Sequence, residues 1–188
     1  MNILLVGGSC SLMDSMILKL RKEGHRVFLL TGDKYRHNKY QKVFERYDFA
    51  YDCENLNDIL ESVNADVTIL MGAFDTNYRL NGEERETVHF ISHLVNILVA
   101  YSMANKKRLI FLSSDEIYNG NYKDDIEQEE KFSGIGIRAD ALSQAEEICE
   151  NFRINRGLDI VTLRLDHLYS IPKEKKDINN ICARMCLD

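Results

Sequence analysis

Short apolar runs alternate along this chain with longer segments of helical periodicity. The strongest runs are continuous stretches of valine, isoleucine and leucine, a pattern typical of strands covered on both faces. We expect strands at Asn2–Val6, Arg26–Leu30, Phe49–Asp52, Asp66–Met71, Arg108–Ser113 and Ile160–Leu165. Helical spacing separates them, at Leu12–Glu23, Leu56–Val63, Glu84–Asn105 and Ala139–Arg156. This alternation predicts an α/β fold with a doubly wound parallel sheet and right-handed crossovers.

The chain has 188 residues, enough for one domain, and it contains no internal repeat or low-complexity linker. The polar stretch Asn119–Gly134 is expected to be a surface loop between the fifth strand and the helix that follows it. Sixteen residues follow Pro172, enough for one helix such as Asp177–Met185. We therefore expect one domain over residues 1–171 and the start of a truncated C-terminal region at 172–188.

The net charge of −6 and the pI near 5.4 argue against nucleic acid or an anionic membrane as partner, because both need a concentrated basic face. Five cysteines are scattered without a paired framework, which fits a reducing compartment. Only four apolar residues directly precede Gly7, too few for a signal peptide or a membrane span. We expect a cytoplasmic location.

The stretch GGSCSLM follows the first predicted strand and leads into a helix. A strand, a glycine-rich turn and a helix N-terminus together form a phosphate site, because free N–H groups and the helix dipole favour an anion. The three glycines of such a loop allow a tight turn, close approach of a pyrophosphate and close helix packing. Gly7 fills the first position, whereas Cys10 and Met13 replace the other two glycines. The candidate cofactor-binding residues are Gly7, Gly8, Ser9, Cys10, Ser11 and Leu12, and the alternative is a tight turn without a ligand.

The end of the second strand is where an acidic side chain usually takes the ribose hydroxyls. That position is Thr31 here, with Asp33 two residues later. Lys34 and Arg36 would favour a 2′-phosphate, or they are simply solvated.

Five segments of the sequence resemble, in their order and spacing, those of an extended short-chain dehydrogenase/reductase of the NAD-dependent epimerase/dehydratase family. Members of that family act on nucleotide sugars. They are GGSCSLM, GHRVFLLTG, ADVTILMGA, KRLIFLSSDEIYNG and GLDIVTLRLDHLYSIP. The resemblance implies a Rossmann-type domain that binds NAD or NADP, with the substrate held by a smaller C-terminal region. We expect that C-terminal substrate lobe to be absent or minimal in this sequence.

The resemblance carries over residue by residue, and it places Ser114 at the catalytic Ser/Thr of the family. Gly72 and Ala73 fall where the fourth strand lines the cofactor. The Tyr-x-x-x-Lys dyad aligns with Asp140 and Gln144, so both of its residues are replaced. Phe90 replaces an asparagine of the fourth helix, and His167 replaces another after the sixth strand.

Loss of the dyad removes a positioned acid and base, which typically costs about 10²- to 10⁴-fold in rate. Gln144 supplies no positive charge, and a carboxylate such as Asp140 is ordinarily ionised at neutral pH. We therefore predict a degenerate NAD(P)-binding domain without ordinary oxidoreductase turnover, serving as a cofactor sensor or scaffold in a larger protein.

Two other interpretations stay open. One is an active nucleotide-sugar epimerase, dehydratase or reductase in which Asp140 acts as base and a further C-terminal segment completes the site. The other is an interaction module without ligand, paired as a homodimer through the predicted helices Glu84–Asn105 and Ala139–Arg156. An apolar stripe in the helix Glu84–Asn105 would face either the partner or the sheet: Val88, Ile91, Val95, Leu98 and Val99. His89 and His93 have metal-ligand spacing but no evident third ligand, so no metal site is expected.

Overall fold

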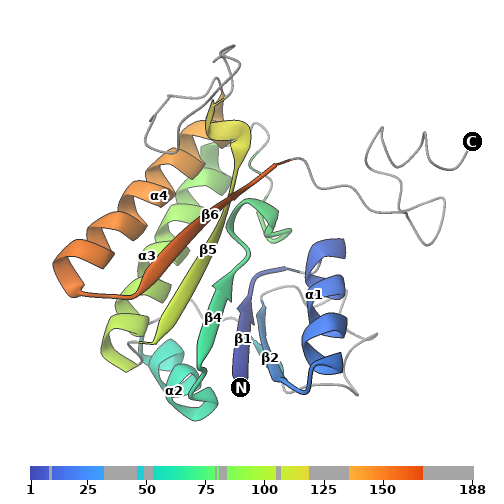
Figure 1. Cartoon of the computed structure of the whole chain (residues 1–188). Helices are drawn as coiled ribbons and strands as arrows, with labels where there is room; N and C mark the ends of the chain where they lie inside the picture. The colour runs from blue at the N-terminus through green and yellow to red at the C-terminus, as the bar shows by residue number, and fades with distance from the viewer. Residues whose placement is uncertain are drawn as a thin grey trace, which may run out of the picture.

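A six-stranded parallel sheet forms the centre of the computed structural model, which describes residues 1–8, 10–31, 46–48, 53–78, 80, 84–104, 107–118 and 136–166. The strand order is β3-β2-β1-β4-β5-β6. The strands are β1 (Asn2–Val6), β2 (Arg26–Thr31), β3 (Arg46–Asp48), β4 (Val67–Leu70), β5 (Arg108–Ser114) and β6 (Ile160–Leu165). Because every neighbouring pair is parallel, all carboxyl ends of the strands meet at one edge, the upper edge in Figure 1.

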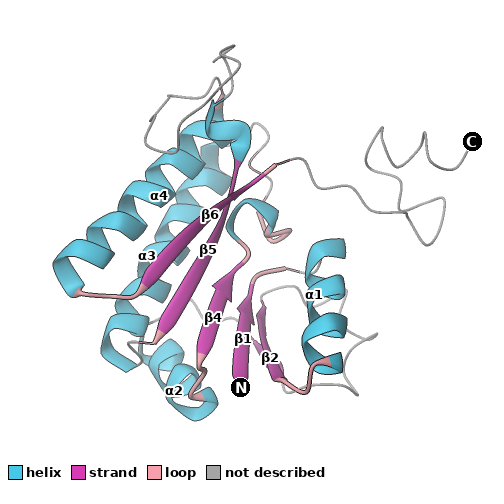
Figure 2. Ribbon diagram, in the orientation of Figure 1, coloured by secondary structure: helices cyan, strands magenta, loops and turns pink. Residues whose placement is uncertain are grey.

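Helices cover both faces of this sheet. Helix α1 (Ser11–Lys22) lies on one face, while α2 (Cys53–Val63), α3 (Glu84–Ala104) and α4 (Ile137–Arg156) lie on the other. Two short 3-10 turns, η2 (Gly72–Phe74) and η3 (Asp115–Tyr118), follow β4 and β5 directly at the carboxyl edge (Figure 2). The doubly wound parallel α/β fold predicted from the apolar pattern is confirmed.

Each face of the sheet has its own hydrophobic cluster, because successive side chains of a strand point to opposite faces. In β1, Leu4 and Val6 join the cluster under α2, α3 and α4, whereas Ile3 and Leu5 join the one under α1. Met13 is 1% exposed within the α1 cluster. The methionine that replaces a loop glycine is therefore a core residue between helix and sheet.

The predicted strands and helices are confirmed within one or two residues at most ends, with one exception. The third strand was expected at Phe49–Asp52, but β3 spans Arg46–Asp48 and pairs with Leu29–Thr31. Residues 49–52, the polar stretch 119–134 and the expected helix Asp177–Met185 lie outside the described residues.

We expect Gly72→Ala to lower the free energy of unfolding by at least about 2 kcal/mol. Gly72 has a φ of 48°, and a Cβ there would lie 2.1 Å from the carbonyl oxygen of Leu112. Gly24→Ala is the matched control, since Gly24 has a φ of 83° but no atom within 4 Å of its Cβ position. Gly24→Ala should lower the free energy of unfolding by about 1 kcal/mol, because only the left-handed backbone conformation is strained. Urea unfolding of both variants measures the difference, and equal losses would show that the close approach to β5 is unimportant.

Candidate functional site

The candidate site lies at the carboxyl edge of the sheet, where β1 and β4 are neighbours. Helix α1 leaves β1 on one face, and α3 follows β4 on the other face. Such a reversal leaves a crevice between the two loops, which is where ligands bind in open α/β sheets.

The Gly7–Gly8 turn fits tightly against the segment that follows β4. Gly7 has a φ of 142°, and a Cβ there would lie 2.8 Å from the Cβ of Met71. A Cβ on Gly8 would lie 2.4 Å from Oγ1 of Thr76 and 2.8 Å from the backbone nitrogen of Asn77. Both glycines are therefore required for this close approach, which a side chain would block.

Asp75 places a carboxylate against this turn. Its Oδ1 accepts a hydrogen bond of 2.7 Å from the Gly8 N–H and another of 2.9 Å from the Asn77 N–H. The backbone group that the loop offers to an anion is thus bonded to an anion of the chain itself. Asp75 was not among the residues predicted from sequence, because it lies 67 residues from Gly8.

Cys10 is the N-cap of α1. Its Sγ accepts a hydrogen bond from the Met13 N–H at 3.4 Å. Burial raises the pKa of the Cys10 thiol, and this effect outweighs the lowering by the hydrogen bonds of the helix terminus. The side chain at the second glycine position therefore occupies an N–H group at the helix N-terminus, where a phosphate would bind.

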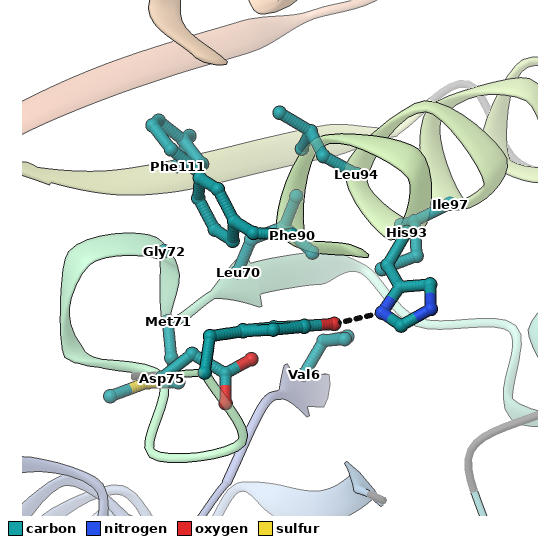
Figure 3. A pocket seen from close by; sticks show the side chains of 11 residues that line it. Val6, Leu70, Met71, Gly72, Asp75, Phe90, His93, Leu94, Ile97 and Phe111 are labelled. Carbon is teal, nitrogen blue, oxygen red and sulfur yellow. Dashed lines mark hydrogen bonds between the residues drawn. The ribbon is translucent and has the colours of Figure 1, made fainter. Parts of the chain in front are cut away.

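A pocket opens beside this turn, between the ends of β1 and β4 and helix α3 (Figure 3). Its cavity volume is about 30 Å³, room for no more than a few water molecules, and it is open in part to solvent. Its walls are mostly apolar, with three polar side chains. The lining residues are Val6, Leu70, Met71, Gly72, Asp75, Tyr78, Phe90, His93, Leu94, Ile97 and Phe111.

Tyr78 and His93 form the polar wall of this pocket. The Tyr78 hydroxyl is hydrogen-bonded to Nδ1 of His93, and the Tyr78 ring packs edge-on against Phe90 with centroids 5.4 Å apart. Burial, and secondarily the charge of His89, lowers the pKa of His93 to about 4. His93 is therefore neutral at physiological pH and offers no positive charge to a ligand.

Ser114 ends β5 and is 5% exposed. Its Oγ donates to Oδ1 of Asp115 at 3.0 Å and accepts from the Glu116 N–H at 3.2 Å. The hydroxyl predicted to be catalytic is thus bonded to two residues of the η3 turn that follows it. Two acidic side chains stand directly beside it.

Arg138, in the first turn of α4, reaches across to this end of the sheet. Its Nε donates to Oε2 of Glu116 at 2.8 Å, and its Nη2 donates to the carbonyl oxygen of Ala73 at 2.6 Å. The guanidinium therefore links the turn after β4 to the turn after β5. Ala73, predicted to line the cofactor, is 5% exposed and contributes this carbonyl oxygen.

Asp140 and Gln144, which align with the family's dyad, are both exposed on α4. The buried face of α4 includes Leu142, Ala145 and Cys149. Arg138 lies one helical turn before Leu142, on the same side of the helix. The assignment of Asp140 as a base stays a prediction. The helical spacing of the apolar residues is the sequence signal that points to Arg138.

The other predicted site residues are distributed as follows. Thr31 ends β2 and is fully buried, Leu12 packs partly buried in the α1 cluster, and Ser11 is the first residue of α1. Gly72 lines the pocket. The positions of Ser9, Asp33, Lys34, Arg36 and His167 lie outside the described residues.

Two further sequence features bear on chemistry. His89 and His93 stack with ring centroids 6.1 Å apart, but the described residues contain no group of three side chains that could hold a metal ion. The lysines among those residues are Lys19, Lys22 and Lys107. Lys19 and Lys22 lie in the last turn of α1. Lys107 directly precedes β5 and forms an ion pair with Asp66. All three therefore lie at the amino edge of the sheet, opposite Ser114.

The structure is similar to several solved sugar-nucleotide enzymes. UDP-glucose 4-epimerase from Brucella ovis, in complex with NAD, matches with a TM-score of 0.75 and 18% identity, over 87% of this chain and 51% of that one. UDP-N-acetylglucosamine 4-epimerase from Bacillus cereus matches with a TM-score of 0.74 and 18% identity, over 92% and 55%. UDP-glucose 4-epimerase from Thermotoga maritima, with UDP-glucose, matches with a TM-score of 0.74 and 20% identity, over 87% and 55%.

At these identities the likeness shows a shared fold, and the chain spans about half the length of these enzymes. None of the curated proteins compared with the sequence matches it. A family model, however, matches residues 3–187, nearly the whole chain. The chain therefore belongs to the NAD dependent epimerase/dehydratase family.

Proposed function

We propose that this domain binds a dinucleotide, NAD or NADP, or a nucleotide sugar, without carrying out the redox turnover of its family, and that it acts as a sensor or scaffold module of a larger protein. The observation that carries this proposal is the position of Arg138. Its guanidinium bridges Glu116 and the Ala73 carbonyl at the end of the sheet where Ser114 lies.

Arginine is unsuited to the task of a proton-transferring residue. Its guanidinium stays protonated in proteins and has no acceptor atom, so it neither takes nor gives a proton in a reaction at neutral pH. Here it is also held by two hydrogen bonds from different parts of the fold. Arg138 thus acts as a structural tie in a place where a catalytic site needs a titrating side chain.

The frame for a nucleotide is nevertheless retained. Gly7 and Gly8 keep the first loop free of side chains and close to the segment after β4. The N-terminus of α1 faces the same crevice. These groups would hold the phosphates of a dinucleotide, which supplies hydride chemistry when a catalytic site surrounds it. The Brucella ovis relative holds NAD and the Thermotoga maritima relative holds UDP-glucose, which supports these two ligand classes.

The first test is turnover. With NAD(H) or NADP(H) present, we expect no detectable conversion of UDP-glucose or UDP-N-acetylglucosamine, measured by chromatographic separation of the sugar-nucleotide products. The physical reason is that Asp140 and Gln144 align with the tyrosine and lysine of the family's dyad, and loss of a positioned acid and base costs about 10²- to 10⁴-fold in rate even with the cofactor bound. Ser114→Ala and Asp140→Asn serve as controls. Turnover that disappears in either variant would establish the rival function, an active enzyme with an atypical site.

The second test concerns the loop. Cys10→Gly removes the sulfur that accepts a hydrogen bond from the Met13 N–H. We expect NAD to bind about 10-fold more tightly to this variant, because the Met13 N–H can then donate a charge-assisted hydrogen bond to a phosphate of NAD. Cys10→Ser is the matched control, because a serine hydroxyl still caps the helix and should give no gain. Calorimetric titration measures both. Tighter binding in Cys10→Ser than in Cys10→Gly would contradict the role given to the cap.

A second candidate function is an interaction module, favoured by the outer surface of α3 and α4. Among the described residues, α3 has the length and composition of a membrane-crossing helix, yet only 33% of that window is buried in the structure. Six of its residues are buried in the core beside α2 and α4, while Val88 and Met103 are exposed apolar side chains on its outer side. Val88 and Ile154 are 62% and 63% exposed. We propose that these two helices pair with a second copy.

A charge on this surface tests that candidate. We expect Val88→Lys to weaken dimerisation about 100-fold, because a two-fold interface loses the buried side chain twice. Leu18→Lys is the matched control, since Leu18 is 57% exposed on α1, on the other face of the sheet. Sedimentation velocity across a concentration series measures both. A wild-type chain that stays monomeric, or equal effects of the two variants, would exclude this interface.

We further propose a cytoplasmic location. The two cysteines among the described residues whose side chains are placed, Cys10 and Cys149, are free thiols, which is consistent with a reducing compartment.

A further inference from the structure

We propose that residues 177–185 form an amphipathic helix that docks, within the same molecule, on an apolar strip of strands β5 and β6 beside α1. The strip consists of the apolar side chains that these two strands direct to the α1 face of the sheet: Ile110, Leu112, Val161, Leu163 and Leu165. This inference goes beyond the proposed function and does not depend on a bound ligand.

The alternation of side chains along a strand gathers the strip on one face. Ile110, Leu112 and Leu165 pack in the hydrophobic cluster under α1. In the β5–β6 ladder, Ile110 lies opposite Val161 and Leu112 lies opposite Leu163. Because residues opposite each other in neighbouring strands share a face, all five side chains lie on the α1 side.

The strip is open to solvent along β6. Leu163 is 41% exposed, and among the described residues it is the one large exposed apolar side chain that belongs to a strand. Val161 and Leu165 on the same face are half-buried. The other face of β6 is closed, since Arg164 binds Glu146 of α4 at 2.7 Å. A parallel sheet ordinarily has both faces covered, so the α1 face lacks a cover over β6.

Helix α1 alone does not cover this face of the sheet. It is the only described helix on the face, and it lies beside β1 and β2, as Figure 1 shows. A helix is about 10 Å wide and strands are about 4.8 Å apart, so one helix covers about two strands. Strands β5 and β6 lie at the other end of the strand order β3-β2-β1-β4-β5-β6. Within the described ranges, no second helix covers the strip.

The sequence that follows β6 contains a matching apolar stripe. Apolar side chains recur at Ile178, Ile181, Cys182 and Met185. This spacing of i, i+3, i+4 and i+7 is that of an amphipathic helix. At 100° per residue, the polar residues of the segment fall on the opposite side: Asp177, Asn179, Asn180 and Arg184. The sequence therefore predicts a helix with one apolar face, which is the complement that an exposed apolar strip requires.

The strip and the predicted helix also agree in length. Between Val161 and Leu165 the strip is about 13 Å long. A helix over 177–185 is about 14 Å long. The ion pair of Arg108 with Asp159 bounds the strip at its amino end. Docking there would thus cover the apolar residues without burying that pair.

The chain between β6 and the segment is long enough to bring the helix back to the sheet. The link from Asp166 to Ile178 spans up to about 40 Å when extended, about three times the length of the strip. A tether of this kind also gives the segment an effective concentration on the order of millimolar at the strip. The segment of the same molecule is therefore favoured over a second copy as the cover.

Hydrogen exchange of the full chain, followed by mass spectrometry, tests this docking. We expect the amides of 178–185 to exchange at least about 10-fold more slowly than in a free peptide of the same sequence. Leu163→Lys should remove this protection, because it places a charge beneath the apolar stripe. Ile181→Lys should remove it too, because it interrupts the stripe itself.

Leu18→Lys is the matched control, since Leu18 is 57% exposed on α1 and lies outside the strip. It should leave the exchange of 178–185 unchanged. Circular dichroism confirms the fold of each variant. Ile181 lies outside the described residues, so Ile181→Lys tests the docking even where Leu163→Lys disturbs the sheet.

Loss of protection in Leu163→Lys and Ile181→Lys, but not in Leu18→Lys, supports the inference. Wild-type amides that exchange as fast as the free peptide overturn it, and so does protection that survives Leu163→Lys or falls equally in Leu18→Lys. Protection that rises with protein concentration, together with a dimer in sedimentation velocity, assigns the strip to a second copy and overturns docking within one molecule. None of these measurements uses a ligand, so the turnover and NAD-binding results decide the proposed function separately.

Discussion

The close approach of the Gly7–Gly8 turn to residues 71–77 is the contact on which the rest of the site depends. Two side-chain-free positions let the ends of β1 and β4 meet at distances that no Cβ tolerates. That approach brings Asp75 to the Gly8 N–H and leaves a pocket against α3. A glycine pair usually opens a loop for a phosphate, whereas here it also makes room for a segment of the same chain.

The charged side chains described at the carboxyl edge bond to one another and to the backbone of neighbouring turns. Ser114 bonds to Asp115 and to the Glu116 backbone, and Glu116 pairs with Arg138, which also binds the Ala73 carbonyl. This network joins β4, β5 and α4 through groups that satisfy one another. In this network Ser114, Glu116 and Arg138 each bond to a group of the chain itself.

Family membership describes the fold of this domain, and its side chains describe what the fold carries. The fold is that of sugar-nucleotide epimerases, of which this chain spans about half the length. Function resides in side chains placed on such a frame, and the frame alone does not supply them. The acids and the arginine at the strand ends are therefore the better guide to what this domain does.

The sequence by itself determined most of the strands, the helices and the family resemblance, because periodicity and residue identity are local properties. Only the tertiary structure decided which side chains meet at the sheet edge. Asp75 and Gly8 are 67 residues apart and Arg138 and Ala73 are 65 apart, joined by crossovers whose packing no local pattern records. On α4, a two-residue shift in alignment rotates the helix face by about 200°. That rotation separates the exposed Asp140 from Arg138, because at low identity only packing against the sheet sets which face points inward.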